Sequence, residues 1–129
     1  MKNLLFLPLV FLLVLSVKNL DLSEPQESEY YFATREPTVT ELIDHTFKEE
    51  RFMAHRIIKC ESGGRADATN YNTDGSTDRG LFQINSVHAR KVNGDLDSLY
   101  DPKVNIQVAY QIFKASSWDP WVCAGKVGV

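Results

Sequence analysis

Cysteine is scarce in this sequence, which has two among its 129 residues, at positions 60 and 123. Neither Cys60 nor Cys123 has a second cysteine or a histidine at the spacing of a zinc site. The three histidines are dispersed along the chain. Residues 70–81 imitate a calcium loop, but its first position is Asn70 and its twelfth is Leu81, where an acidic residue is needed. We therefore expect no metal and no cofactor.

Basic residues are too few to indicate a nucleic-acid-binding protein. Residues 21–51 contain three Lys and Arg against nine Asp and Glu, and residues 52–129 contain nine against eight. Neither segment carries the positive excess with which proteins attract phosphate backbones. We expect no nucleic-acid partner.

Long hydrophobic runs are limited to the segment from Leu4 to Val17, which directly follows Met-Lys-Asn. As a helix this segment would rise only about 21 Å, short of a bilayer core of roughly 30 Å. A charged start followed by such a run is typical of a signal peptide, so residues 1–20 predict export. No Ala-x-Ala cleavage site follows the run, and the alternative is an uncleaved anchor that tethers the protein to a membrane. The expected location is extracellular, periplasmic or at the cell wall.

The rest of the chain divides into a spacer and one domain. Residues 21–37 are acidic and polar without a clear period, which is typical of a disordered linker. Residues 38–129 are long enough for a single domain, which we expect to be monomeric. In an exported chain, the two cysteines favour one structural disulfide, Cys60 to Cys123, over two free thiols.

Apolar spacing and capping residues predict three main helices. They span Thr38 or Thr40 to about Lys48, Glu50 to Ser62, and Pro102 to about Lys114. Between the second and third, residues 66–86 are rich in Asn, Asp, Thr and Gly, which predicts a β-hairpin or a three-stranded ribbon. A short helix from Val87 to Lys91, capped by Ser86, should follow the ribbon.

Two carboxylates stand in contrasting surroundings. Glu61 ends the apolar stripe of the second helix, and we expect Trp118 and Trp121 to desolvate it, which favours the protonated form that a general acid needs. Asp78 lies among hydrogen-bonding side chains and should stay ionised. Taken alone, Glu61 would more often be a helix-end carboxylate that faces water.

Three segments around these carboxylates resemble known families. Cys60-Glu61-Ser62-Gly63-Gly64 resembles the glutamate-Ser-Gly signature of transglycosylase (SLT-type) domains, as found in bacteria and phages, and residues 80–86 resemble the second motif of that family. Residues 68–78 are similar to chicken-type lysozymes. Both families belong to the lysozyme-like superfamily, and the resemblance covers residues 38–123.

The resemblance implies an α+β fold: a small, mostly helical lysozyme-like domain with a short β-ribbon and a saccharide cleft. It also implies peptidoglycan glycan strands as substrate, cleaved at the β-1,4 bond between N-acetylmuramic acid (MurNAc) and N-acetylglucosamine (GlcNAc) by transglycosylase or lysozyme chemistry. Glu61 would be the general acid and Asp78 the second carboxylate. The alternative for Asp78 is a structural role in the ribbon, since lytic transglycosylases can work with the glutamate alone. The expected saccharide-binding residues are Asn70, Asn72, Gln83, Asn85, Tyr110 and Trp121.

Two features depart from these families. Animal lysozymes carry several disulfides, whereas this chain has cysteines for one, so an animal-type identity is not supported. Arg79 follows Asp78 where relatives place an apolar or aromatic residue, and its charge could alter the electrostatics of Asp78. The alternative function is a catalytically silent domain of the same fold that binds or regulates at the cell wall.

Overall fold

Helix α4 (Pro102–Ser116) is the central element of the fold, because residues along most of its length are buried: Asn105, Ile106, Val108, Ala109 and Ile112. The Asp101 carboxylate caps it by accepting hydrogen bonds from the backbone N–H groups of Lys103 and Val104, and Pro102 occupies the first helical position. The computed structural model describes residues 35–128, and those from Glu36 onward form one compact unit. The predicted segment 1–20 and most of the linker 21–37 lie outside the described residues.

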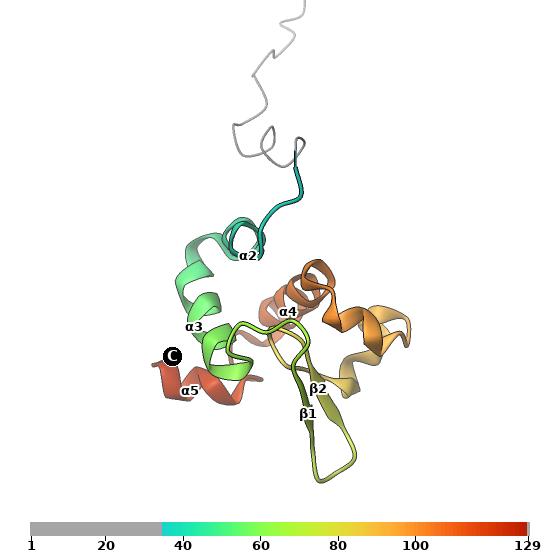
Figure 1. Ribbon diagram of the computed structural model, residues 1–129. Coiled ribbons are helices and arrows are strands. Elements are labelled where there is room, and N and C mark those ends of the chain that lie inside the picture. The colour runs from blue at the N-terminus through green and yellow to red at the C-terminus, as the bar shows by residue number, and fades with distance from the viewer. Residues whose placement is uncertain (1–34, 129) are drawn as a thin grey trace, which may run out of the picture. The chain divides into compact units, whose positions relative to one another are not determined.

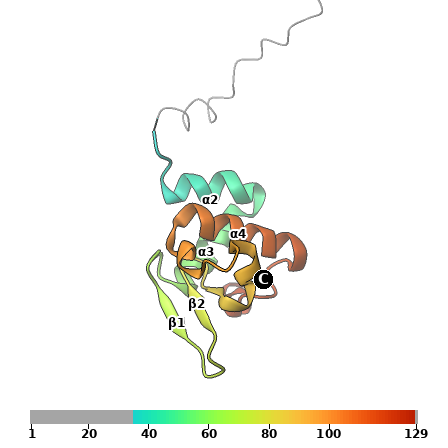
Figure 2. The same ribbon diagram turned by 90° about the vertical axis from the view of Figure 1, so that its right-hand side faces the viewer.

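Helix α2 (Val39–Phe47) packs against α4, as both ribbon views show (Figures 1 and 2). A capping box fixes its start: the Thr38 hydroxyl accepts from the Glu41 backbone N–H, and the Glu41 carboxylate accepts from the Thr38 backbone N–H. Ile43 and Phe47 are buried, as the apolar spacing predicted. A 3₁₀ turn, η1 (Lys48–Glu50), connects α2 to the next helix.

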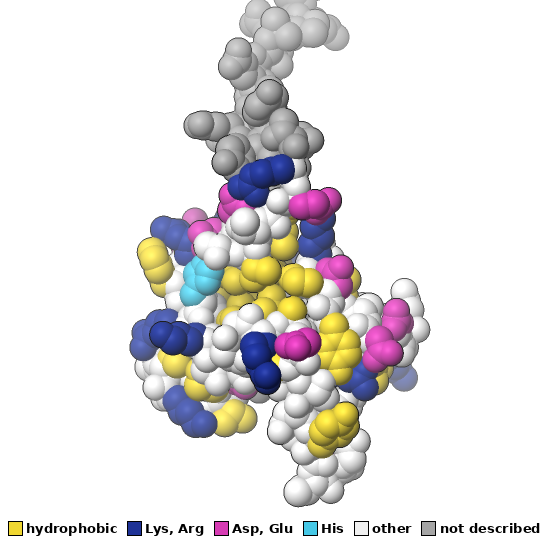
Figure 3. Space-filling view, in the orientation of Figure 1, with side chains coloured by type: hydrophobic (Ala, Val, Ile, Leu, Met, Phe, Trp, Pro, Cys, Tyr) yellow, Lys and Arg dark blue, Asp and Glu magenta, His cyan; other side chains and the backbone are white. Residues whose placement is uncertain are grey.

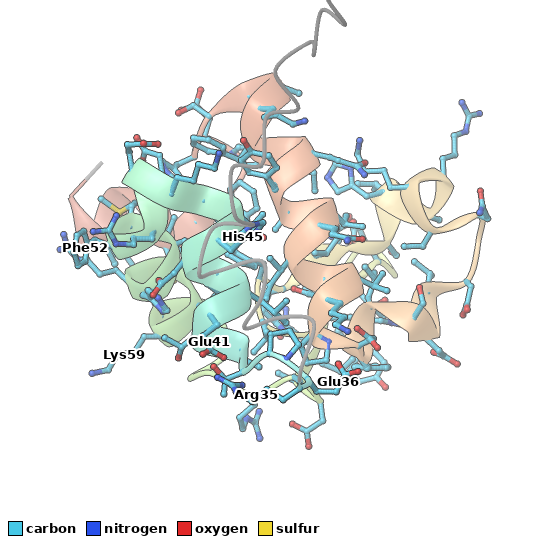
Figure 4. All side chains as sticks on the ribbon, turned by 90° about the horizontal axis from the view of Figure 1, so that it is seen from above. Arg35, Glu36, Glu41, His45, Phe52 and Lys59 are labelled. Carbon is cyan, nitrogen blue, oxygen red and sulfur yellow. A yellow bond between two sulfur atoms is a disulfide. The ribbon has the colours of Figure 1, made fainter. Side chains whose placement is uncertain are left out.

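Helix α3 (Arg51–Glu61) carries the predicted apolar stripe on its inner face, with Ala54, Ile57 and Ile58 buried. Its outer face bears Phe52 and Lys59, which extend away from the body of the domain (Figure 4). The short helix α5 (Val122–Val127) lies beside α3 and is joined to it by the predicted Cys60–Cys123 disulfide (Figure 1). The apolar stripe of α3 therefore ends at Glu61, with α5 alongside.

The predicted ribbon is a three-stranded antiparallel sheet in the order β1 (Thr69–Tyr71), β2 (Thr77–Arg79) and β3 (Ile84–Asn85). Its register places Asp78 opposite Asn70 on one side and opposite Asn85 on the other. The β1–β2 hairpin projects from the helical body (Figures 1 and 2), and its surface is mostly uncharged and polar (white in Figure 3). The fold is thus the expected small α+β domain, mostly helical with a short ribbon.

Two short elements differ from the expectation. The helix after the ribbon is the 3₁₀ helix η2 (Ser86–Val92), and its cap is Asn85, not the predicted Ser86, because the Asn85 side chain accepts from the Val87 backbone N–H. The Ser86 hydroxyl instead accepts from the Thr77 backbone N–H, which ties β2 to η2. A further 3₁₀ helix, η3 (Leu96–Tyr100), was not predicted, and neither was α5.

A buried amide connects the ribbon to the helices. The Asn105 side chain, fully buried on α4, accepts from the Phe82 backbone N–H and donates to the carbonyls of Arg79 and Leu99. Gly80 lies against it with a φ of +73°. This junction fixes how the ribbon leaves the body of the domain. No helix among residues 35–128 is long and apolar enough to cross a membrane.

Candidate active site

A cleft of about 600 Å³ lies where the ribbon meets the helices, and it contains both predicted carboxylates. Its ribbon wall is polar and includes Asn72, Ser76, Asp78 and Asn85, whereas the opposite side is more apolar. The complete lining is Glu61, Tyr71, Asn72, Thr73, Asp74, Ser76, Asp78, Gln83, Ile84, Asn85, His88, Ile112, Pro120, Trp121 and Val122. Such a mixture of apolar surface and convergent polar groups is typical of a ligand site.

Glu61 is half-buried at the last residue of α3. One of its carboxylate oxygens, Oε1, accepts a 3.0 Å hydrogen bond from the backbone N–H of Cys123 at the start of α5. Because the side chain lines the cleft, it is not a helix-end carboxylate turned freely to water. The disulfide and this hydrogen bond together fix the position of Glu61 relative to α5.

Asp78 is surrounded by amide groups. Its Oδ2 accepts from the Nδ2 of Asn72 at 2.9 Å and of Asn70 at 3.3 Å, and its Oδ1 accepts from the Nδ2 of Asn85 at 2.8 Å. Each of these partners is a donor, which suits an ionised carboxylate, since a protonated carboxyl would have to donate from one oxygen. The three amides come from β1, from the turn after it and from β3.

The amides around Asp78 are themselves held by Ser76. Its hydroxyl oxygen accepts from the second N–H of both Asn72 and Asn85, each at 3.0 Å. Hydrogen bonds from the side chain and backbone of Ser76 also lower the pKa of Asp74, in the hairpin turn. The polar wall of the cleft is therefore a connected network that includes two carboxylates.

Two further predicted residues, Gln83 in the turn before β3 and Asn70 on β1, lie near this network. Gln83 adopts a φ of +48°, and its Nε2 donates to the carbonyls of Ala68 and Gly80 while the residue lines the cleft. Asn70 contacts Asp78 but is not part of the lining. Both N–H groups of each amide are thus used within the protein, and any saccharide contact would fall to the amide oxygen of Gln83.

The tail tryptophans are core residues. Trp118 is buried against Phe47 and Phe113, and its indole N–H donates to Glu50. It does not line the cleft, so it does not desolvate Glu61 there as predicted. Trp121 does line the cleft, but it is also buried and donates its indole N–H to the Phe82 carbonyl. The cleft is therefore shielded by one tryptophan, not two.

Tyr110 and Arg79 lie away from the cleft lining. Tyr110 packs edge-on against Phe47, so its predicted saccharide contact stays a prediction without a place in the lining. Arg79 pairs with Asp97 at 2.6 Å and lies over the Tyr100 ring at 5.6 Å. Since successive strand residues point to opposite faces, Arg79 turns away from Asp78 and tethers η3 to the ribbon instead. The ion-pair partner of Arg79 is thus Asp97, not Asp78.

His88 is one of the cleft residues that the sequence analysis missed, as are Asp74 and Ser76 of the polar wall. His88, on η2, lines the cleft, and burial together with the charge of Lys91 lowers the pKa of its imidazole. Histidine alone is weak evidence of function, which is why none of the three received a role. The Asn85 cap that positions His88 was not predicted either, so the sequence offered no clear signal for it.

The architecture and this cleft define a lysozyme-like domain, and comparison with known proteins agrees. The lysozyme-like domain family matches residues 49–123, more than half of the chain, and the chain belongs to that family. The resemblance to lysozyme-like, SLT-type domains is thereby confirmed. Membership suggests a glycosidase that cleaves peptidoglycan.

Two relatives make the likeness more specific. The chain is 34% identical over 70 residues to the invasion protein IagB of Salmonella typhimurium and of Salmonella typhi, which covers 51% of this chain and 44% of IagB. It is 63% identical over 30 residues to lysozyme C II of Oncorhynchus mykiss, which covers 23% of this chain and 21% of that lysozyme. The chain thus spans less than half of the length of each relative.

Proposed function

We propose that this protein cleaves the glycan strands of peptidoglycan at the β-1,4 bond between MurNAc and GlcNAc, with Glu61 as general acid. The observation that supports this most is that Glu61 and Asp78 line one cleft in unlike environments. Glu61 has one backbone N–H donor, whereas Asp78 accepts from three amides. Glycosidases with two carboxyls need such a difference, since one must hold a proton while the other stays charged.

Each carboxyl has a distinct task in the proposed reaction. Glu61 donates its proton to the glycosidic oxygen, which allows the leaving sugar to depart as a neutral hydroxyl. The charge that develops on the remaining sugar resembles an oxocarbenium ion, and the ionised Asp78 stabilises it electrostatically. Glu61, now deprotonated, then accepts a proton from the attacking nucleophile, which is water in a lysozyme or the 6-hydroxyl of the same MurNAc in a transglycosylase.

Export is part of the proposal. The Cys60–Cys123 disulfide fits an oxidising compartment, and peptidoglycan lies outside the cytoplasmic membrane. Residues 1–20 would direct the chain there, either as a cleaved signal peptide or as a membrane anchor. The acidic segment that follows would serve as the spacer before a monomeric catalytic domain.

A comparison of wild type with Glu61→Gln tests this function. We expect the variant to lose wall lysis by a factor of at least about 10² while retaining affinity for purified peptidoglycan, because the amide cannot donate an acidic proton. Mass spectrometry of the wild-type digest then identifies the nucleophile: 1,6-anhydro ends indicate a transglycosylase and reducing ends a lysozyme. Binding without lysis by the wild-type protein would instead favour a silent wall-binding domain.

A further inference from the structure

His88 is a titratable cleft residue to which the proposed reaction assigns no task. It lies on η2, three residues after Asn85. The side-chain N–H of Asn85 donates to Asp78, and its side-chain oxygen caps η2. The same residue that holds the second carboxylate therefore also fixes the start of the segment that carries His88. This connection places the imidazole at the cleft beside the polar ribbon wall.

The His88 ring has no hydrogen-bond partner among residues 35–128, although it is half-buried. His55 offers a contrast, since its Nε2 lies 2.7 Å from the Asp44 carboxylate. A polar group that loses contact with bulk water usually finds a hydrogen-bond partner in the protein or in ordered water, and a ligand that fills the cleft would have to supply that partner in place of water. The nitrogens of His88 are available to a ligand, whereas the amides of the ribbon wall are already engaged with each other.

The surroundings of His88 favour its neutral form. Burial is the larger cause of its lowered pKa, and the charge of Lys91 on the same helix is the smaller one. Glu61, Asp74 and Asp78 also face the cleft, but the net direction remains downward. A neutral imidazole has one nitrogen that donates and one that accepts, a combination suited to the hydroxyl and acetamido groups of an amino sugar.

We propose that His88 is a saccharide-binding residue whose neutral imidazole accepts a hydrogen bond from a hydroxyl or acetamido N–H of the glycan strand. This inference rests on the proposed function and extends it to a residue that follows Asn85 in the chain. Bound sugar would cover the ring further and remove more water from it. Because desolvation disfavours the cation, the glycan binds the neutral form more tightly than the protonated form.

The direction of the pH effect follows from this preference. Protonation removes the accepting nitrogen and must overcome the added desolvation, so affinity is full above the pKa of His88. The ordinary value of 6.5 is an upper bound for that pKa in the free protein, since the shift is downward. Affinity therefore falls as the pH decreases below 6.5 and through the pKa of His88.

The test measures binding of soluble, alternating GlcNAc–MurNAc oligosaccharides by calorimetry. All proteins carry Glu61→Gln, which prevents turnover and removes one titrating group from the cleft. The added changes are His88→Ala, His88→Gln and, as a control on the same helix, Val87→Ala, since Val87 is 74% exposed and outside the cleft lining. Glutamine can accept and donate a hydrogen bond but does not titrate in this range.

At pH 7 we expect His88→Ala to weaken binding about three- to tenfold, as for loss of one hydrogen bond. His88→Gln should recover most of that loss, and Val87→Ala should bind as the parent does. As the pH is lowered from 7, the parent should lose affinity once the pH falls through the His88 pKa, and His88→Gln should lack this loss. The glutamine variant retains Asp74 and Asp78, so it corrects for their titration.

Equal affinity of the His88→Ala variant and the parent at pH 7 would overturn the inference, as would the same pH dependence in the parent and His88→Gln. The two proposals fail separately. If the Glu61→Gln protein still lyses wall, the proposed function is wrong whatever His88 does. If lysis requires Glu61 but the His88 variants bind normally, only the role of His88 is wrong.

Discussion

The backbone N–H of Cys123 donates a 3.0 Å hydrogen bond to Glu61, and the disulfide partner of Cys123 is Cys60, the residue directly before Glu61. Glu61 is therefore adjacent in sequence to the disulfide, and its carboxylate is hydrogen-bonded to α5, the helix that the disulfide holds in place. A single bond between α3 and α5 holds both the position of Glu61 and that of its donor.

Replacement of both cysteines by alanine should show separately how much the disulfide stabilises the fold and whether it positions Glu61. The bridge closes a loop across a sequence separation of 63 residues, so its loss should lower the free energy of unfolding by roughly 4 kcal/mol in the chain-entropy model. The N–H at position 123 belongs to the backbone and remains. Urea unfolding measures the stability change, and lysis measured well below the unfolding midpoint reports on the site.

We expect the double-alanine variant to lose lytic activity even where it is fully folded, because α5 is then free to move its N–H from Glu61. A single Cys60→Ala change should behave like the double variant, since either loss breaks the same bond. Full activity of the folded double variant would show that packing alone holds α5 against α3.

Replacing an asparagine beside Asp78 by alanine should reduce activity more at Asn72 than at Asn70. Asn72 donates to Asp78 at 2.9 Å and is half-buried, whereas Asn70 donates at 3.3 Å and is exposed. A hydrogen bond to a charged group contributes about 1.5–3 kcal/mol, so Asn72→Ala should lower kcat/KM about tenfold or more. Asn70→Ala should cost less.

Steady-state lysis rates of the two asparagine variants, compared with their thermal midpoints, measure this difference. If both variants keep wild-type rates, the charge of Asp78 has no part in the reaction and its network serves only the ribbon. A lytic transglycosylase that depends on Glu61 alone would give that result.

The helices and the ribbon were predictable because their signals are local. Apolar spacing on α3, the capping residues Thr38 and Asp101, and the Asp74-Gly75 turn each act within a few residues. The identity of the two carboxylates came from a resemblance, and their shared cleft agrees with it. Local pattern and family motif together placed most of the domain.

The elements that were missed depend on contacts between distant residues. The Asn105 amide resembled any polar residue of a helix, yet it satisfies backbone groups on two other segments. Trp118 was expected beside Glu61, but Phe47, 71 positions earlier in the chain, stacks on it at 5.3 Å and draws it into the core. Helix α5 is only six residues long, and the disulfide holds it in place. No short-range pattern contains this information.

Asn105→Leu should destabilise the fold strongly although leucine has a similar size. The change leaves the Phe82 N–H and the carbonyls of Arg79 and Leu99 buried without their side-chain partner. Each unsatisfied group costs about 1–3 kcal/mol, so we expect a loss of about 3 kcal/mol or more in urea unfolding. Gln107→Ala on the exposed side of the same helix is the control and should change stability by less than about 0.5 kcal/mol. Equal stability of the two variants would mean that water replaces the amide.

Gly80→Ala and Gly75→Ala form a matched pair that isolates close packing from backbone strain. Both glycines have positive φ, +73° and +87°, so alanine at either position is strained by about 1–3 kcal/mol. Only at Gly80 would the new Cβ meet other atoms, namely the Asn105 side chain and the Leu99 carbonyl, whereas at Gly75 nothing lies within 4 Å. Overpacking should therefore add about 1–3 kcal/mol at position 80 alone.

Because the Asn105 junction sets the direction of the ribbon, Gly80→Ala should also lower lysis by the folded protein, while Gly75→Ala should not. Similar losses of unfolding free energy in both variants would show that the junction can shift to admit a methyl group.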